Sequence, residues 1–440
     1  MGATLTDTFK KKILLDLDSD IGSNGNYYIG IGRSEQWNAT DAAPEATNNI
    51  RDVRVASLGL QSIKSAEDRS FVVPRNNWTS GTTYSAYDDY QVGYPSNKYY
   101  VITEDNRIYI CLEAPDAAST VKPNETYTNA AFKTSDGYVW KFLYQVISAN
   151  ANKYLSANYL PVHHQTTASG DASLQQQKDI SDAAIAGEIS GIAVDNGGTG
   201  YTGTPTITIN GNGTGATATA STSGGVITAI NLDSDATKCR KFGSGYTMAG
   251  VTITGGSGSG AIARVKLAPR KGHGYDPRDD LKSTQMMFNT KPAGAEGNGE
   301  GKFIVGQDFR QVMLLRNPYQ GADSSALYTQ SLGRAGTKLT LNASANNVSL
   351  DEVVVKGSAK GIVDQIDSSL LFLHQNDSTG YVAFTAGALV DSAGNSVGTI
   401  SSVSNMDVFP NKFDVYYLEN RAAVTRAADQ TEDIKVVISI

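Results

Sequence analysis

The sequence predicts a mainly β fold, in which a multi-layer β-sandwich body carries small β-rich domains inserted in its loops, with few short helices. The chain has 44 glycines among 440 residues, and its 22 tyrosines outnumber its 12 phenylalanines. Glycine supplies turns and tyrosine favours strands, so this balance is typical of β proteins with many turns. Charged residues make up only 18% of the chain. A chain of this length is expected to hold about three folding units.

The first predicted element is a short amphipathic helix over residues 7–17, which Asp7 can cap. Its apolar side chains share one face: Phe9, Ile13, Leu14 and Leu17. Alternating or continuous apolar runs then predict strands over 27–31, within 98–112 and within 137–147. These strands form a first β-rich block that ends near Pro161.

Residues 165–268 are poor in charge and contain an internal repeat. Gly198-Thr199-Gly200-Tyr201-Thr202 recurs as Gly243-Ser244-Gly245-Tyr246-Thr247. Each copy continues with an apolar run, a glycine turn and a second run, which predicts turn, strand, turn and strand. One copy cannot bury its apolar face alone, so we expect the two copies to form one small β-sandwich or barrel.

The chain returns to its main body at Gly272-His273-Gly274-Tyr275-Asp276-Pro277, which repeats the glycine-tyrosine theme. A strand over 309–316 follows, and Pro318 ends it. Residues 322–405 are predicted to form a second, barrel-like insertion. Its expected strands are 352–356, 361–366, 370–374 and 381–384.

The last predicted strands are 413–418 and 434–440, and the second stays apolar to its end, so we expect it to pair inside a sheet. The predicted domain division follows from these elements. The sandwich body comprises residues 1–164, 269–321 and 406–440; the two insertions are 165–268 and 322–405.

Charge and cysteine content exclude several classes of protein. The formal net charge of −7 argues against nucleic acid as the main partner, because such proteins attract phosphates with a basic field. No run of 18 apolar residues and no signal peptide are found, so we expect neither a membrane partner nor secretion. Cys111 and Cys239 cannot make a disulfide framework, and folding in a reducing cytoplasm fits.

Nucleotide-binding motifs fail on their spacing. Around Gly301-Lys302, Glu296 stands where a phosphate-binding loop needs its first glycine, and Phe303 follows the lysine. The glycine runs 211–215 and 255–260 are flanked by strands and do not open a helix, so they lack the helix dipole that a dinucleotide site needs.

Metal motifs fail in the same way. Asp16, Asp18 and Asp20 have the spacing of calcium ligands, but the glycine falls at 22 and Tyr27 replaces the bidentate glutamate. No zinc-binding spacing joins the histidines and cysteines. The histidines are His163, His164, His273 and His374. No cofactor and no metal ligand are therefore predicted.

Catalytic motifs are not found either. No Gly-x-Ser-x-Gly elbow occurs, and neither cysteine has a sequence-local base. The adjacent carboxylates Asp88-Asp89 and Asp279-Asp280 point apart and are interpreted as solvated loop charges. The basic clusters 10–12 and 238–241 are interpreted as exposed surface. We predict no catalytic residue and no enzyme.

One segment is strongly aromatic. An extended strand over 137–144 places every second side chain on one side: Tyr138, Trp140, Phe142 and Tyr144. A sandwich core or a subunit interface is the favoured use of such a face, and a carbohydrate platform is the alternative.

Four motifs span the chain in order. They are Gly32-Arg33-Ser34-Glu35-Gln36-Trp37; Asp136-Gly137-Tyr138-Val139-Trp140-Lys141-Phe142-Leu143; Phe309-Arg310-Gln311-Val312 with Asn317-Pro318; and Leu418-Glu419-Asn420-Arg421 with Asp429-Gln430-Thr431-Glu432. Together they resemble the baseplate wedge protein of T-even-like contractile-tailed bacteriophages that forms homodimers in the outer part of each wedge. The motifs do not cover the two predicted insertions.

The resemblance implies a layered β-sandwich without catalytic activity, located in the virion tail and assembled in the host cytoplasm. It also implies a homodimer that joins other baseplate wedge proteins and tail-pin proteins.

Two other classes of function stay open. A receptor- or glycan-binding tail protein is supported by the Gly-Tyr-Thr repeats and exposed aromatic residues. A tail glycan hydrolase needs two carboxylates across a cleft, which sequence alone cannot locate.

Overall fold

The computed structural model describes residues 4–23, 26–66, 68–94, 96, 98–291, 306–426 and 433–440. Strands make up 42% and helices 12%, so the predicted mainly β fold with few helices is confirmed. No described helix is both long and apolar enough to cross a membrane. The chain divides into two compact units: unit 1 is Met1–Lys11, Ser70–Met286 and Ser439–Ile440, and unit 2 is Lys12–Arg69 and Met287–Ile438. The predicted body and insertion boundaries stay predictions.

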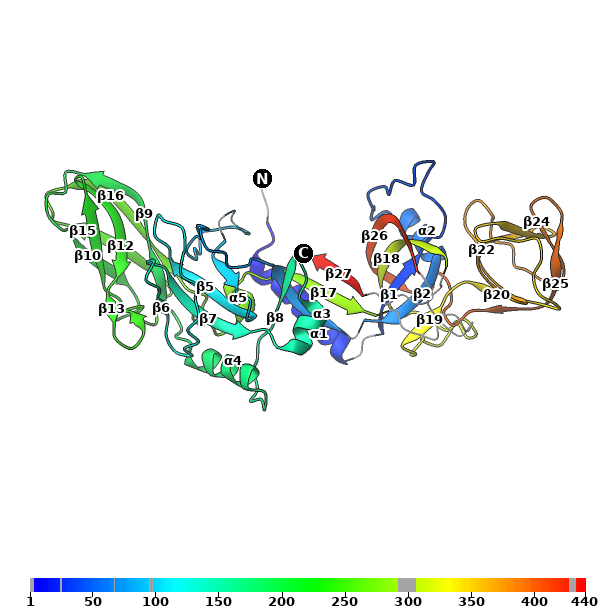
Figure 1. The fold of residues 1–440 in the computed structure, drawn as a ribbon, viewed down its shortest axis with the longest axis horizontal. Helices are drawn as coiled ribbons and strands as arrows, with labels where there is room; N and C mark the ends of the chain where they lie inside the picture. The colour runs from blue at the N-terminus through cyan, green and yellow to red at the C-terminus, as the bar shows by residue number, and fades with distance from the viewer. Residues whose placement is uncertain are drawn as a thin grey trace. The chain divides into compact units, whose positions relative to one another are not determined.

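An aromatic sheet with the strand order β4-β5-β7-β6 forms the first part of unit 1 (Figure 1). The strand predicted over 137–147 is β7, and both of its faces are buried. Trp140 is 0% exposed and stacks on Tyr138, with ring centroids 5.6 Å apart. This strand is therefore core, and a carbohydrate platform on it is ruled out. The strands are β4 (Tyr100–Ile102), β5 (Arg107–Glu113), β6 (Phe132–Lys133) and β7 (Val139–Gln145).

Helix α4 (Ala172–Ala183) was not predicted. The Asp171 carboxylate caps it by accepting from the backbone N–H groups of Ser173 and Leu174 at 2.9 and 3.0 Å. Ile180, on the buried face of α4, packs in the same core as Trp140. The other elements of this part are α3 (Ser148–Tyr154), α5 (Pro277–Asp280), and β3 (Arg69–Pro74) paired with β8 (Tyr159–Val162).

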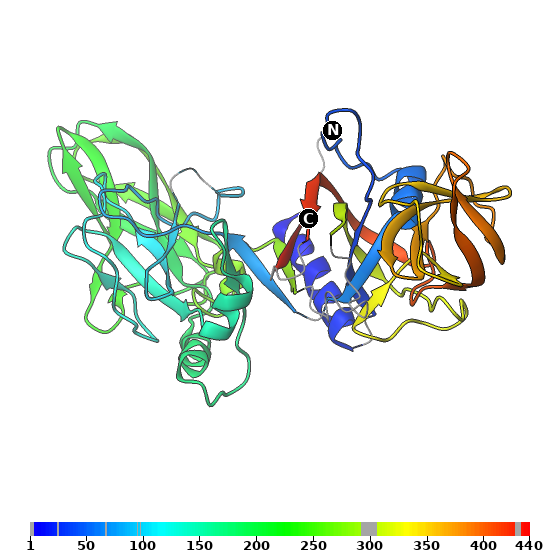
Figure 2. The same ribbon diagram turned by 45° about the vertical axis from the view of Figure 1, so that its right-hand side comes forward.

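Each copy of the glycine repeat contains two strands joined by a glycine turn, as predicted, although Gly198 and Thr199 of the predicted first turn belong to β9. The strands pair as two-stranded sheets, drawn in green in Figure 2, and one common sandwich or barrel stays a prediction. Strands β10 (Thr206–Gly211) and β15 (Ala249–Thr254), one from each copy, pair antiparallel. Tyr201 lies over Gly258, and Tyr246 lies over Gly213, so each copy packs its tyrosine on a glycine of the other. The remaining strands are β9 (Ile189–Thr199), β11 (Ala218–Ser223), β12 (Val226–Leu232), β13 (Ser234–Asp235), β14 (Cys239–Arg240) and β16 (Ser259–Leu267).

Replacing Gly258 with alanine is expected to lower the free energy of unfolding by about 1–3 kcal/mol, because the added Cβ would overlap the Tyr201 ring. Gly250→Ala is the matched control. It lies in β15 with nothing within 4 Å of an added Cβ, so its effect should be neutral or stabilising by about 0.4–1 kcal/mol. Urea denaturation measures both. Equal stability of the two variants would show that the tyrosine does not need the glycine.

Unit 2 contains a five-stranded antiparallel sheet in the order β19-β2-β1-β18-β26. Every residue of β1 is buried, as expected of a central strand covered on both faces. Gly32 is required at its end, because a Cβ there would lie 2.5 Å from the Gly59 carbonyl oxygen. The strands are β1 (Tyr27–Gly32), β2 (Leu60–Ser65), β18 (Asp308–Arg316), β19 (Leu332–Arg334) and β26 (Asp414–Thr425); helix α2 (Ile50–Leu58) precedes β2.

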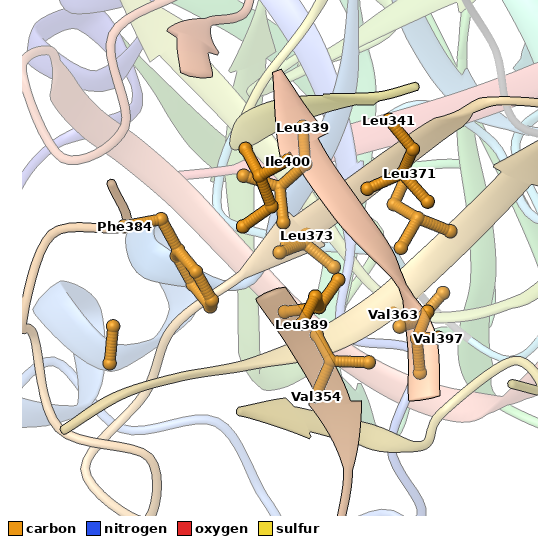
Figure 3. Packing of buried hydrophobic residues seen from close by; sticks show 11 residues of the cluster. Leu339, Leu341, Val354, Val363, Leu371, Leu373, Phe384, Leu389, Val397 and Ile400 are labelled. Atoms are coloured by element: carbon orange, nitrogen blue, oxygen red, sulfur yellow. The ribbon is translucent and has the colours of Figure 1, made fainter. Parts of the chain in front are cut away.

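The predicted barrel is present as six strands in the closed order β20-β23-β22-β21-β24-β25 (Figure 1). Strand β20 pairs with both β23 and β25, which leaves no free edge. The inward side chains of the barrel strands, from Leu339 to Ile400 along the chain, fill the barrel interior (Figure 3). The strands are β20 (Thr337–Leu341), β21 (Val353–Lys356), β22 (Ala359–Asp367), β23 (Leu370–His374), β24 (Gly387–Asp391) and β25 (Ser396–Asn405).

The strand predicted over 381–384 is wrong. The Asn376 side chain accepts hydrogen bonds from the backbone N–H groups of Ser378 and Thr379, which closes a turn, and Gly380 has φ of 72°. The chain then runs as a loop in which Tyr381 is half exposed and Phe384 alone enters the barrel core.

The two ends of the chain also form regular structure. Helix α1 (Asp7–Ser23) begins at the predicted residue and extends six residues past the predicted end, while Phe9 is half exposed and does not join an apolar face. The C-terminal strand β27 (Ile434–Ser439) belongs to a four-stranded sheet in the order β27-β17-β3-β8, where β17 is Gln285–Thr290. The predicted pairing of this strand is confirmed.

Candidate functional site

Three of the four sequence motifs meet in unit 2, although they are far apart in the sequence. The motif 32–37 starts at the end of β1, 309–312 lies in β18, and 418–421 lies in β26. These strands are neighbours, and the register places Gln311 opposite both Gly32 and Asn420. We call these three segments the motif cluster. The remainder of the fourth motif, 429–432, lies outside the described residues.

Arg310 is the centre of the motif cluster, with a side chain only 4% exposed. Its guanidinium donates to the Asp41 carboxylate at 2.8 to 3.0 Å, to Asp308 at 3.0 Å and to the Ser34 carbonyl oxygen. Hydrogen bonds from Arg310 lower the pKa of the Asp41 carboxyl below its ordinary value. A planar guanidinium suits this arrangement because its donors form a rigid fork.

The other polar side chains of the motif cluster also bind across motifs. Trp37 Nε1 donates to the Arg421 carbonyl oxygen at 2.9 Å, and Gln311 Nε2 donates to Asn420 Oδ1 at 2.8 Å. The Arg33 guanidinium lies over the Trp37 ring, 4.2 Å from its centroid. Each motif therefore supplies partners for another motif, which is typical of a structural joint.

A buried charged triad extends the joint to the barrel. His374 of β23 is 3% exposed, and its Nδ1 lies 2.9 and 3.0 Å from the two carboxylate oxygens of Asp364 of β22. Its Nε2 lies 3.3 Å from Glu35 Oε1, an ion-pair contact without the alignment of a hydrogen bond. Ser34 Oγ donates to Asp364 at 3.1 Å. The motif 32–37 thus binds the barrel through two consecutive residues.

The electrostatics favour the ionised forms of His374 and Glu35. Burial by itself disfavours the imidazolium, but the attraction of Asp364 and the contact with Glu35 outweigh it and raise the pKa of His374 to about 10. Burial also opposes ionisation of Glu35, yet the contact with His374 lowers its pKa to about 2. A histidine held protonated is a poor general base near neutral pH. The triad is better suited to fastening than to proton transfer.

The motif 136–143 lies in unit 1, outside the motif cluster, and has a purely structural environment. Asp136 accepts from the backbone N–H groups of Thr120 and Val121 at 2.8 and 2.9 Å, which fixes the neighbouring loop. Gly137 has φ of 98°, a conformation that favours glycine. Tyr138 then donates to the Ala117 carbonyl oxygen at 2.7 Å. The motif positions the aromatic core described above.

The sequence did not predict a hydrogen-bonded serine, histidine and aspartate that the structure brings together in unit 1. Ser190 Oγ is hydrogen-bonded to His273 Nε2, and His273 Nδ1 lies 2.7 Å from Asp280 Oδ1. This is the connectivity that hydrolases use to activate a serine nucleophile. No local motif announces it, because 83 residues separate the serine from the histidine.

The burial of the Ser190, His273 and Asp280 side chains fits a structural role. The three residues are 0–1% exposed, so a substrate has no access to Ser190 Oγ in this structure. The second Asp280 oxygen accepts from the Gly274 N–H at 2.8 Å, and Glu188 accepts from the His273 N–H at 2.7 Å. The network joins β9, the segment 272–274 and α5. It fastens both ends of the repeat block with bonded, buried polar groups.

The three aspartates considered as calcium ligands each pair with a different lysine or arginine side chain. On α1, Asp16 pairs with Lys12, Asp18 lies 2.6 Å from Arg69, and Asp20 lies 3.1 Å from Arg316. Within the described ranges, no group of three or more His, Cys, Asp or Glu side chains is placed to hold a metal ion. The Gly301-Lys302 segment lies outside those ranges.

The interpretation of two charged pairs as solvated loop charges is wrong in part. Asp88 binds Arg264 with two contacts of 2.8 and 2.6 Å, and Asp280 is fully buried on His273. Asp279 stays exposed, but its carboxylate pairs with Lys11. In the cluster 238–241, Arg240 is 8% exposed and paired with Glu113. Long-range partners, which sequence spacing cannot show, neutralise these charges.

Comparison of the sequence with protein-family models gave no match, and a search of curated proteins gave no match either.

Proposed function

We propose that this chain is a structural subunit of the outer baseplate wedge of a contractile phage tail, forms a homodimer, and joins other wedge and tail-pin proteins in the virion. The observation that carries the proposal is the motif cluster. Three motifs of the resembled family supply one another's hydrogen-bond partners around Arg310. Motifs that serve a common joint are expected of a structural part.

The receptor- or glycan-binding alternative loses its main sequence support. Tyr201 and Tyr246 of the repeats are 7% and 5% exposed and pack on glycines. The aromatic face of β7 is core. Carbohydrate platforms need exposed aromatic rings, and neither of these features provides one.

Strand β26 supports self-association. It stands at one end of the sheet order, so its outer edge pairs with no other strand of the described residues. It is 12 residues long, and Tyr416 on it is 50% exposed. A long edge strand is a ready template for pairing with another chain, although Trp37 already binds the Arg421 carbonyl oxygen of this strand. We propose that a second copy pairs there.

Light scattering at micromolar concentration is expected to give twice the chain mass of 46.6 kDa. The dimer is expected to bury a total interface of roughly 2,000 Å² or more. Tyr416→Lys should dissociate the dimer, because a lysine on an edge strand opposes pairing. Tyr381→Lys is the matched control: Tyr381 is 52% exposed but lies in a barrel loop. A wild-type monomer would contradict the proposed dimer, and a dimer unaffected by Tyr416→Lys would exclude β26 as its contact.

Assembly is tested by mixing the purified chain with the wedge and tail-pin proteins of the same virus and measuring complex formation by sedimentation. A stable complex is expected. Failure of every such protein to bind, or cleavage of host envelope glycans by the chain alone, would overturn the proposed function.

A further inference from the structure

Lys266 of β16 has a largely buried side chain, and none of the described residues forms an ion pair with its amine. The residue is 8% exposed, and in the register of the β16–β9 pair it stands opposite Gly191. A Cβ on Gly191 would lie 3.1 Å from the lysine Cε and 3.4 Å from Nζ. The missing side chain at position 191 therefore provides the space that the ammonium group occupies.

This amine lines a cavity of about 200 Å³ inside unit 1. The walls come from the end of β5, from β9 and from β12, so the aromatic sheet and the repeat block both contribute. Leu112 and Ile192 supply apolar surface, while Asn231 supplies an exposed amide at the rim. A cavity of this size admits one small polar group and is below the range for drug-sized ligands.

The charges around the cavity do not neutralise Lys266. Glu113 is bound by Arg240 through two contacts of 2.7 Å, and Asp88 is bound by Arg264 in the same two-pronged way. No residue in the described part of the chain forms a hydrogen bond or ion pair with Lys266 Nζ. Arg264 also pairs with Asp195 at 3.3 Å, so the nearby carboxylates are held by arginines and none of them contacts the Lys266 ammonium.

We propose that the Lys266 cavity binds a carboxylate group, with the ammonium as its counter-ion. A buried charge is costly unless it is paired, and a carboxylate in the cavity would supply the ion pair that Lys266 lacks among the described residues. Burial also lowers the pKa of Lys266, and the more distant charges of Asp88 and Glu113 do not offset this effect. The carboxylate belongs either to a small free acid or to an acidic side chain of a polypeptide.

The test uses the full chain labelled with ¹³Cε-lysine, titrated with acetate and separately with N-acetyl-glutamate amide at constant ionic strength. The Lys266 Cε resonance, assigned by its loss in Lys266→Met, is expected to shift and saturate. Tighter binding of the blocked glutamate identifies a polypeptide carboxylate, and tighter binding of acetate identifies a free acid. Gly191→Ala should weaken binding about tenfold or more, because its Cβ displaces the amine.

Thermal unfolding supplies the second readout. Either carboxylate should raise the Tm of the wild type but not of Lys266→Met, and Lys266→Met alone should unfold at a higher temperature than the ligand-free wild type because an unpaired buried charge is removed. Lys338→Met, which changes a lysine of unit 2, should keep the ligand-dependent rise. A Cε resonance that does not respond, or an equal rise of Tm in Lys266→Met, would overturn the proposal.

Discussion

Arg310→Met is expected to lower the free energy of unfolding of unit 2 by about 3–5 kcal/mol, because removing one partner of a buried ion pair leaves the other without compensation. Arg310 is 4% exposed and donates to Asp41, Asp308 and the Ser34 carbonyl oxygen at once. A methionine fills part of the volume but donates no hydrogen bond. The motif 32–37 should then lose its attachment to β18.

Urea denaturation followed by ¹⁹F-tryptophan NMR separates the two units, because the chain has three tryptophans. Trp37 reports on unit 2, while Trp78 and Trp140 report on unit 1. The Trp37 signal should move to lower urea in Arg310→Met, and the other two signals should not move.

Two controls define the cause of the Arg310 effect. Arg51→Met also removes an arginine–aspartate pair of unit 2, but Arg51 is 73% exposed, so the change should be within about 1 kcal/mol. Arg310→Lys keeps the charge and should still be destabilising, since an ammonium cannot replace the fork of donors. Equal stability of Arg310→Met and Arg51→Met would contradict the central role of Arg310.

The sequence was most informative where local pattern and turn chemistry agree. Strand β23 matches the prediction at both ends, because Leu370–His374 is an apolar run and follows the turn at Ser368, whose φ is 53°. The run at 381–384 has similar composition, but the Asn376 turn and the insertion of Phe384 alone into the barrel override the pattern. Tertiary context decided the second case.

Helix α4 shows why polar helices are missed. Its sequence is rich in glutamine, and its buried face rests on Ile180 and the aliphatic part of Gln177, so no apolar periodicity is visible. The capping carboxylate Asp171 was the one local signal.

The candidate site was predictable only in part. The motifs were visible in the sequence, but their convergence depends on the pairing of β1, β18 and β26, which sequence spacing does not give. The same reason hid the contact of Ser190 with His273 and of Glu35 with His374. Contacts of high sequence separation are set by topology, and a single sequence carries no record of them.

The stability of unit 2 is expected to depend on pH through His374. Its pKa is raised from 6.5 to about 10 in the folded protein, so its stabilising contribution is complete below pH 6.5 and is lost as the pH rises toward 10. The pKa of Glu35 is lowered from 4.5 to about 2, so its contribution is complete above pH 4.5 and is lost as the pH falls toward 2. Both contributions are complete only between about pH 4.5 and 6.5.

The other charges that face this triad do not change the sign. Arg33 lies near Glu35, and Asp351 lies near both Asp364 and Glu35. Arg33 favours the ionised form of Glu35, whereas burial raises the pKa of Asp351 and so disfavours its negative charge. The triad therefore links the barrel to the loop after β1, and the strength of this link depends on the protonation of His374.

The free energy of unfolding of unit 2 should fall by about 2–3 kcal/mol between pH 6.5 and 8.5. The reason is that one proton bound only in the folded state contributes about 1.4 kcal/mol per pH unit. The difference in unfolding free energy between the wild type and His374→Gln, measured on the Trp37 signal, should shrink by that amount over this interval. His163→Gln is the control: burial lowers the pKa of His163, so it titrates below pH 6.5 and cannot produce an alkaline slope. A difference between wild type and His374→Gln that stays constant from pH 6 to 9 would mean that His374 is neutral in the fold, and the barrel would then be held by packing and neutral hydrogen bonds alone.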